Sequence, residues 1–102
     1  MEDTIVINGV TYKAVNPSQG RIKIVILQRG HVAIGRFSRE ENDCIMTRCA
    51  IIRIWGTTRG LGELVNGPTE KTVLDKCGNL EFDYLTVIAA MDVEQSKWES
   101  AL

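Results

Sequence analysis

The ten residues from Trp55 to Leu64, WGTTRGLGEL, bring together the groups that a phosphate-bearing ligand needs. Trp55 offers an aromatic plane on which a base can stack. Thr57 and Thr58 add hydroxyl donors, and Arg59 adds a charged fork of donors suited to phosphate. The glycines, which permit close backbone approach and positive φ angles, are Gly56, Gly60 and Gly62. This composition predicts a binding loop.

Two other segments carry similar groups. NGPTEKT follows a few residues later, and Arg36 and Arg39 flank Phe37 at the end of another expected strand. We expect both segments to face the same mouth as the loop. The predicted ligand-binding residues are Trp55, Gly56, Thr57, Thr58, Arg59, Gly60, Arg36, Phe37, Arg39, Asn66, Thr69 and Lys71.

A purely structural interpretation of the loop stands beside the functional one. Trp55 would then be a core residue, the glycines would only form turns, and Arg59 would be a surface charge. A lone glycine-rich loop is a weak signal. The coincidence of an aromatic, hydroxyls, glycines and a cation favours binding, because a plain turn needs only one glycine. For the second tryptophan, Trp98, we expect a packing role.

Catalytic signatures are absent from the sequence. There is one histidine, His31, and no G-x-S-x-G, H-E-x-x-H or Walker motif. Carboxylates at positions 40, 41 and 43 are typical of a solvated hairpin tip. Glu81 and Asp83 alternate with Leu80, Phe82 and Tyr84, which predicts that both carboxylates lie on the solvent face of a strand. We therefore predict no catalytic residues and no enzyme activity.

The cysteines do not indicate a metal centre. A zinc site would need Cys44, Cys49, Cys77 and His31 to converge, and no C-x-x-C pair supports that arrangement. Reduced, partly buried thiols are the expected state. We predict no metal and no cofactor.

Composition excludes several classes of protein. The formal net charge of −1 argues against general binding to long nucleic acid. No apolar run reaches the roughly 18 residues of a membrane helix. The start, MEDTIV, has neither a basic nor an apolar signal region. The expected protein is one cytoplasmic domain spanning residues 1–102.

The first half of the chain predicts antiparallel strands. Asn8-Gly9 between apolar runs predicts a hairpin with a type I′ turn, and residues 16–20 a loop. RIKIVILQ predicts a central strand. In HVAIGRF, Gly35 indicates a bulge or a close backbone approach. SREENDC predicts a turn with Asn42-Asp43 at its tip, and CIMTRCAIIRIW predicts one or two strands.

The second half predicts the helices. GLGELV is expected to form a short helix capped by Thr57 or Thr58. In NGPTEK, Pro68 suits the second position of a turn. TVLD and LEFDYLTVIAAMDV are expected to be strands on either side of a KCGN turn, and EQSKWESAL a terminal helix. The predicted fold is a small α+β domain, β-rich, with a mainly antiparallel, twisted sheet and one or two short helices.

The segment VILQRGHVAIGRFSREENDCIMTRCAIIRIWGTTRGLGELVNGPT resembles small bacteriophage-encoded proteins of unassigned function. The resemblance covers roughly residues 25–93, and Trp55-Gly56 and Leu61–Leu64 carry most of it. It implies no catalytic residues. Phages also encode small β-rich sponges that sequester the nucleotide signals of CBASS and Thoeris defence, many of them homo-oligomers. This chain is similar to them in size and loop chemistry, which is an analogy and not a sequence match.

Three functions follow as hypotheses. The first is a homo-oligomeric anti-defence protein of immune evasion that binds a nucleotide second messenger, a cyclic oligonucleotide or ADP-ribose derivative, in the host cytoplasm without catalysis. The second is an inhibitor module that docks on a host protein by a sheet edge or the hairpin tip. The third is a small hydrolase of nucleotide signals. The sequence leaves all three open.

Overall fold

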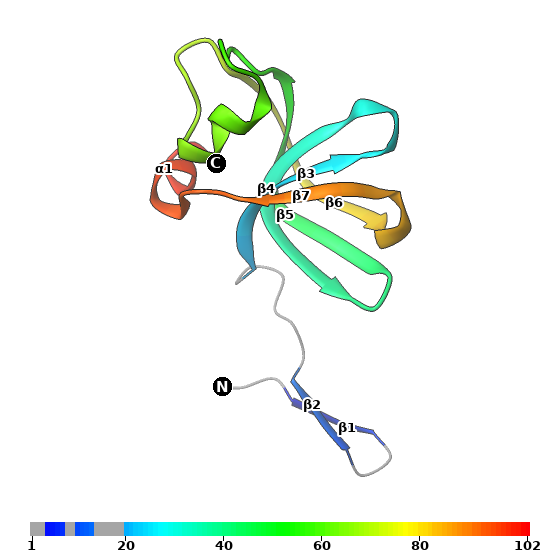
Figure 1. The fold of residues 1–102 in the computed structure, drawn as a ribbon. Helices are drawn as coiled ribbons and strands as arrows, with labels where there is room; N and C mark the ends of the chain where they lie inside the picture. Colours follow the sequence, from blue (N-terminus) through cyan, green and yellow to red (C-terminus); the bar gives the residue numbers. More distant parts are fainter. Residues whose placement is uncertain (1–3, 8–9, 14–19) are drawn as a thin grey trace.

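The computed structural model describes residues 4–7, 10–13 and 20–102; for the first two ranges it describes the backbone alone. The domain contains seven strands, three 3₁₀ turns and one α-helix among these residues (Figure 1). In chain order they are β1 (Thr4–Ile7), β2 (Val10–Lys13), β3 (Arg21–Leu27), η2 (Gln28–Gly30), β4 (Val32–Glu40), β5 (Asp43–Ile54), η3 (Leu61–Asn66), β6 (Val73–Asp83), η4 (Tyr84–Thr86), β7 (Val87–Asp92) and α1 (Gln95–Glu99).

The main sheet has five strands in the order β6-β5-β4-β3-β7, and every neighbouring pair is antiparallel. Short turns join β3 to β4 and β4 to β5, as expected for antiparallel neighbours, whereas the longer segment 55–72 joins β5 to β6. β1 and β2 form a separate antiparallel pair in which Ile7 lies opposite Val10. That register confirms the predicted hairpin, whereas its turn, Asn8-Gly9, and the expected loop up to residue 19 lie outside the described residues. A β-rich antiparallel domain with short helices is confirmed.

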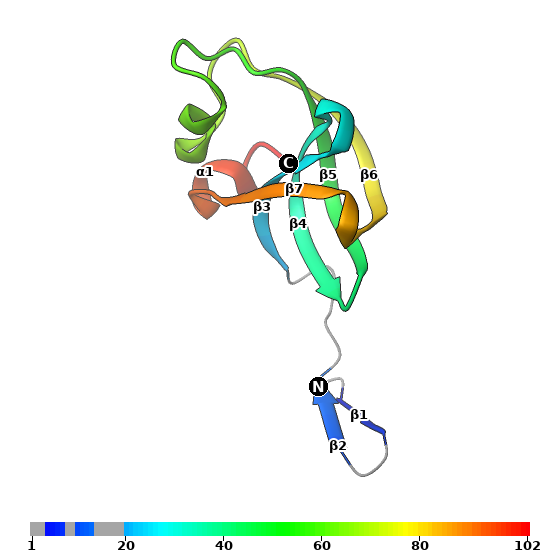
Figure 2. The ribbon, with the colours of Figure 1, turned by 45° about the vertical axis from the view of Figure 1, so that its right-hand side comes forward.

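One face of the sheet is covered by the end of the chain. Figures 1 and 2 show α1 and η3 side by side over this face. Trp98 of α1 is fully buried against Leu64 of η3, and its indole N–H donates to the Leu64 carbonyl at 2.8 Å. The sheet contributes apolar side chains such as Ile22, Ile24 and Ile34 to this cluster. The predicted terminal helix and the packing role of Trp98 are confirmed.

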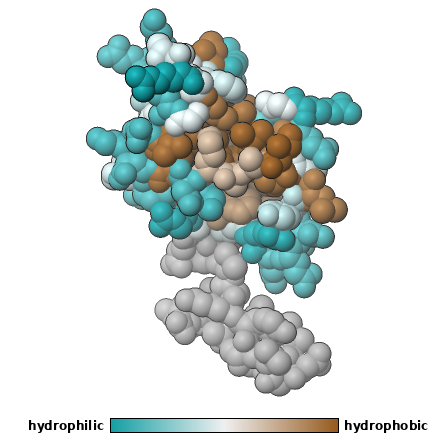
Figure 3. All heavy atoms as spheres, viewed as in Figure 1, coloured by the Kyte–Doolittle hydropathy of each residue, from teal (hydrophilic) through white to brown (hydrophobic). Residues whose placement is uncertain are grey.

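The opposite face carries a second, less enclosed cluster. Val25, Ala33, Met46 and Cys49 are buried there. The side chains around them are only partly buried: Leu27, Phe37, Ile51, Leu80, Phe82 and Val87. Figure 3 shows hydrophobic side chains gathered on the side of the molecule that Figure 1 presents. No described helix lies over this second cluster.

Three predictions about the strands hold in detail. Gly35 sits where the β4–β5 register shifts, and a Cβ there would lie 2.9 Å from the Cys49 Cα, so this glycine marks both a bulge and a close backbone approach. Residues 43–54 form one strand, β5, which stays continuous although Arg48 takes a φ of 50°. Glu81 and Asp83 are both exposed, as their alternation predicted.

The KCGN prediction is wrong. Residues 76–79 do not turn, because β6 runs without interruption from Val73 to Asp83. Gly78 takes a φ of 76° inside the strand, next to a register shift opposite Cys49, so the turn-like composition forms a bulge. The chain turns later, at η4. There the Asp83 carboxylate accepts a hydrogen bond from the Leu85 N–H at 2.8 Å, and η4 separates β6 from β7.

Three local boundaries also differ from the predictions. The β4–β5 turn is Glu41-Asn42 and not Asn42-Asp43, because β5 already begins at Asp43. The GLGELV helix is a 3₁₀ segment whose N-cap is Gly60, without a side-chain cap from either threonine. Pro68 does not hold the second turn position, since the hydrogen-bonded turn runs from Thr69 to Thr72.

Candidate functional site

The predicted binding loop leaves the sheet as an arm, which we define as residues 55–72 between β5 and β6. Its two sides are tied together at their base. The Thr72 hydroxyl donates to the Trp55 carbonyl at 2.7 Å, and the Thr69 hydroxyl donates to the Gly56 carbonyl at 2.6 Å. A Cβ at position 56 would overlap the backbone of Lys71. Glycine is therefore required at position 56, because the backbone of Lys71 and Thr72 passes directly against it.

Glu63 closes the tip of the arm. Its Oε2 accepts hydrogen bonds from the backbone N–H groups of Thr58 and Arg59, at 3.1 and 3.0 Å, and lies 3.4 Å from the Thr58 hydroxyl. Glu63 is the third residue after the N-cap Gly60, the position from which a glutamate reaches back to free amides in a capping box. Two backbone amides of the predicted binding loop thus already hold a carboxylate of the same chain.

Apolar and cationic side chains remain exposed along the arm. Trp55 is 41% exposed and the preceding Ile54 is 50% exposed. The Trp55 backbone is nevertheless held in place by Thr72. Arg59 and Lys71 are exposed, and no side-chain ion pair to either is found among residues 20–102. Asn66 is exposed at the end of η3.

Arg36 and Phe37 do not join the arm. The Arg36 guanidinium donates to the Gly20 carbonyl and forms an ion pair with Glu99 of α1. The Phe37 ring packs against Phe82, with 6.1 Å between the ring centroids. Both residues are therefore engaged in contacts that hold elements of the fold together.

Arg39 lies at the other end of the sheet from the arm. Its guanidinium stacks on Tyr84, 3.3 Å from the ring centroid, and its Nε donates to the Glu41 carbonyl. Arg39 pairs with Cys44 near the start of β5, whereas the arm follows the end of that strand. An extended strand of this length spans roughly 35 Å. The structure thus divides the predicted site residues and keeps those of positions 55–71 together.

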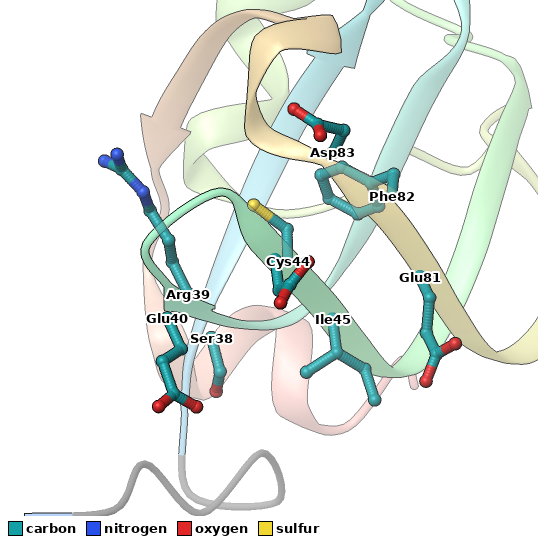
Figure 4. A pocket seen from close by; sticks show the side chains of 9 residues that line it. Ser38, Arg39, Glu40, Cys44, Ile45, Glu81, Phe82 and Asp83 are labelled. Carbon is teal, nitrogen blue, oxygen red and sulfur yellow. The ribbon is translucent and has the colours of Figure 1, made fainter.

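A hollow of about 560 Å³ lies next to the β4–β5 turn, lined by the ends of β4 and β6 and the start of β5. Figure 4 shows that its side chains do not converge: Glu40, Ile45 and Glu81 point to one side of the hairpin, whereas the Cys44 sulfur points toward Phe82. Four carboxylates and a single arginine line the hollow. The residues are Ser38, Arg39, Glu40, Asp43, Cys44, Ile45, Glu81, Phe82 and Asp83.

This excess of carboxylates disfavours a phosphate-bearing ligand in the hollow by like-charge repulsion. All four carboxylates are exposed, in agreement with their predicted place on the solvated surface. Their spacing along the chain does not show that the ends of β4 and β6 and the start of β5 bring them together. Residues 20–102 and the described strands contain no cluster of side chains suited to a metal ion.

The three cysteines are free thiols. Cys44 and Cys49 are buried, and Cys77 is exposed. Burial, together with the neighbouring Cys77 thiol, raises the pKa of the Cys49 thiol from 9.0 to about 12. Burial also raises the pKa of Cys44. Neither buried thiol forms a ready nucleophile at neutral pH, because the reactive species is the thiolate.

Comparison with known proteins adds no family. No protein-family model matches the chain, and no curated protein matches it. Within the part of the chain that the structure describes, no helix is long and apolar enough to cross a membrane. The candidate site therefore rests on the geometry of the arm.

Proposed function

We propose that this protein binds and sequesters a phosphate-bearing nucleotide signal on the arm. The observation that carries the proposal is the exposed indole of Trp55 on a backbone held by Thr72, in the same arm as the exposed cations Arg59 and Lys71. Stacking on an aromatic plane is worth about 1–3 kcal/mol per base. A base stacked on Trp55 would bring its phosphate toward these cations.

In this proposal the Arg59 guanidinium pairs with the phosphate of the ligand. A charge-assisted hydrogen bond contributes about 1.5–3 kcal/mol, and the exposed side chain reaches a ligand without breaking a contact of the fold. Arg36 and Arg39 are not assigned to this ligand, because each is held by partners elsewhere. The proposed ligand contacts therefore include fewer residues than the sequence predicts.

The groups around the arm suit a protein that binds a nucleotide without cleaving it. Hydroxyls, backbone amides and cations bind phosphate but do not accept a proton from water. Glu63 is the carboxylate closest in sequence to Arg59, and its Oε2 is already engaged by two amides. The protein would then act as an anti-defence sponge in the cytoplasm of the host cell. A hydrolase remains the alternative, distinguished by the state of the ligand after binding.

Isothermal titration against cyclic di-adenylate, cyclic tri-adenylate and ADP-ribose tests the proposal. We expect micromolar or tighter binding to one of them. Trp55→Ala and Arg59→Ala should each weaken it about tenfold, which corresponds to about 1.4 kcal/mol. Arg21→Ala is the matched control, since Arg21 is an exposed arginine at the start of β3, opposite Phe37 and toward the end of the sheet away from the arm. Absence of binding to the whole panel at micromolar concentration would reject the proposal.

Recovery of the ligand separates sponge from hydrolase. The complex is heated to denature the protein, and the released nucleotide is identified by chromatography and mass spectrometry. A sponge returns the intact nucleotide in an amount equal to that bound. Recovery of a cleaved product would assign the protein to the hydrolase alternative.

A further inference from the structure

The five-stranded sheet has two edges, and they are protected to different degrees. β6 forms one edge, and its register with β5 is interrupted near Gly78, whose φ is 76°. Charges and bulges of this kind discourage the addition of a further strand. The exposed charged residues of β6 are Asp75, Lys76, Glu81 and Asp83.

β7 forms the other edge and has little of this protection. Its sequence, VIAAMD, has one charged residue, and the Asp92 carboxylate already pairs with Lys23 at 3.1 Å. Among the described strands, β7 pairs only with β3 (Figures 1 and 2). Ala89 and Ala90 are exposed. An apolar strand with one unpaired side is a template for another strand.

Exposed apolar side chains adjoin this edge. Ile88 is 64% exposed and has no partner residue in β3, because the β3–β7 register skips it between Leu27 and Ile26. Leu85 in η4, three residues before it, is 73% exposed. These are the two most exposed large apolar residues of the described chain. Such side chains on a free edge indicate a protein contact.

We propose that β7 pairs with β7 of a second copy of this chain, antiparallel, about a two-fold axis at Ala89. In this register Ala89 faces Ala89 of the other copy, Ile88 faces Ala90, and Val87 faces Met91. Small methyl groups at the axis allow the two strands to approach to the usual 4.7–4.9 Å. The product is one continuous sheet that uses up the free β7 edge of both copies, so the assembly closes as a dimer.

Charge is the reason that a second copy fits. Self-pairing in this register places each Asp92 just beyond Val87 of the other copy, at opposite ends of the strand pair. The two Asp92 residues are then six positions apart, roughly 20 Å along the strands. This exceeds the Debye length of about 8 Å in physiological salt, and each carboxylate keeps its own Lys23. No like charges oppose each other, and every added side chain at the centre is apolar.

Sedimentation velocity of the full chain over a range of concentrations tests the proposal. We expect a monomer–dimer equilibrium with a dissociation constant in the micromolar range. Ile88→Lys should weaken it by at least about tenfold, since the lysine would be desolvated against an apolar strand. Ile88→Val should retain the dimer. Asn79→Lys adds the same charge at an exposed position of β6 and should leave the equilibrium unchanged.

Hydrogen exchange identifies the edge. In a β7–β7 dimer, the backbone amides of β7 that point away from β3 become more protected as the concentration rises, whereas those of β6 do not change. A wild-type chain that remains monomeric at about 0.5 mM, well above a micromolar dissociation constant, would overturn the proposal. A dimer that Asn79→Lys disrupts and Ile88→Lys leaves intact would also overturn it. Circular dichroism of each variant verifies that the fold is retained.

Discussion

The Glu63 carboxylate accepts the backbone N–H of Arg59 at 3.0 Å, so the arm carries its own anion at the place where a ligand's phosphate was expected. The same oxygen accepts the N–H of Thr58. This contact orders the tip of the arm, but it also places a negative charge beside the backbone of Arg59. An incoming phosphate must therefore approach Arg59 in the presence of Glu63.

Replacing Glu63 by glutamine should strengthen nucleotide binding by about three- to tenfold, because removal of one nearby charge is worth about 1 kcal/mol at a solvated site. The amide oxygen still accepts from the two backbone N–H groups, so the arm keeps its shape. Titration of Glu63→Gln beside Glu70→Gln, a variant at an exposed glutamate of the arm, provides the measurement and its control. Weaker binding by Glu63→Gln would show that the carboxylate assists the ligand.

Gly56→Ala should destabilise the domain by more than about 2 kcal/mol. The new Cβ would lie 2.5 Å from the Thr72 nitrogen, and the φ of 68° is unfavourable for alanine. Gly62→Ala is the matched control, since nothing lies within 4 Å of a Cβ there. Urea unfolding of both variants measures the difference. Equal stability of the two would contradict the close packing of the arm.

Trp98→Phe should cost about 2–4 kcal/mol of unfolding free energy. The substitution leaves a cavity in a fully buried site and deprives the Leu64 carbonyl of its indole donor. Trp55→Phe removes an indole that is 41% exposed and should change the stability by less than about 0.5 kcal/mol. Thermal unfolding followed by circular dichroism compares them. The expectation fails if Trp55→Phe is the more damaging change.

The buried thiol of Cys49 should make the domain lose stability at alkaline pH. Its pKa is raised from 9.0 to about 12, so the folded chain keeps the proton that the unfolded chain releases. The contribution is complete below pH 9 and is lost as the pH rises toward 12, at up to about 1.4 kcal/mol per pH unit. Denaturant unfolding between pH 8 and 11 should therefore show a steeper decline for the wild type than for Cys49→Ala.

Local signals in the sequence predicted several elements correctly. Asn8-Gly9 between two alternating runs predicted the β1–β2 pairing, and Gly35 predicted a bulge. The alternation of Glu81 and Asp83 predicted their exposure. These features depend on backbone preferences and side-chain periodicity within a few residues, which the sequence displays directly.

Other features were decided only when distant segments met. Residues 76–79 look like a turn in the sequence, but pairing with β5 keeps them in a strand, because a bulge and a turn both favour glycine at positive φ. The sequence presents Arg36 as a cation available to a ligand. Its partner Glu99 lies 63 positions away, so only the packing of α1 on the sheet shows that this charge is already paired.

The sequence by itself determined that the chain forms a β-rich domain and that residues 55–64 carry an aromatic, hydroxyls, glycines and a cation in one loop. The tertiary structure decided which of these groups are still available. Gly56 and the Glu63-bound amides are used by the chain itself, whereas Trp55 and Arg59 stay exposed. The physical reason is that the amino-acid composition determines which groups a loop contains. The path of the folded chain determines which of those groups are already hydrogen-bonded or packed within the protein.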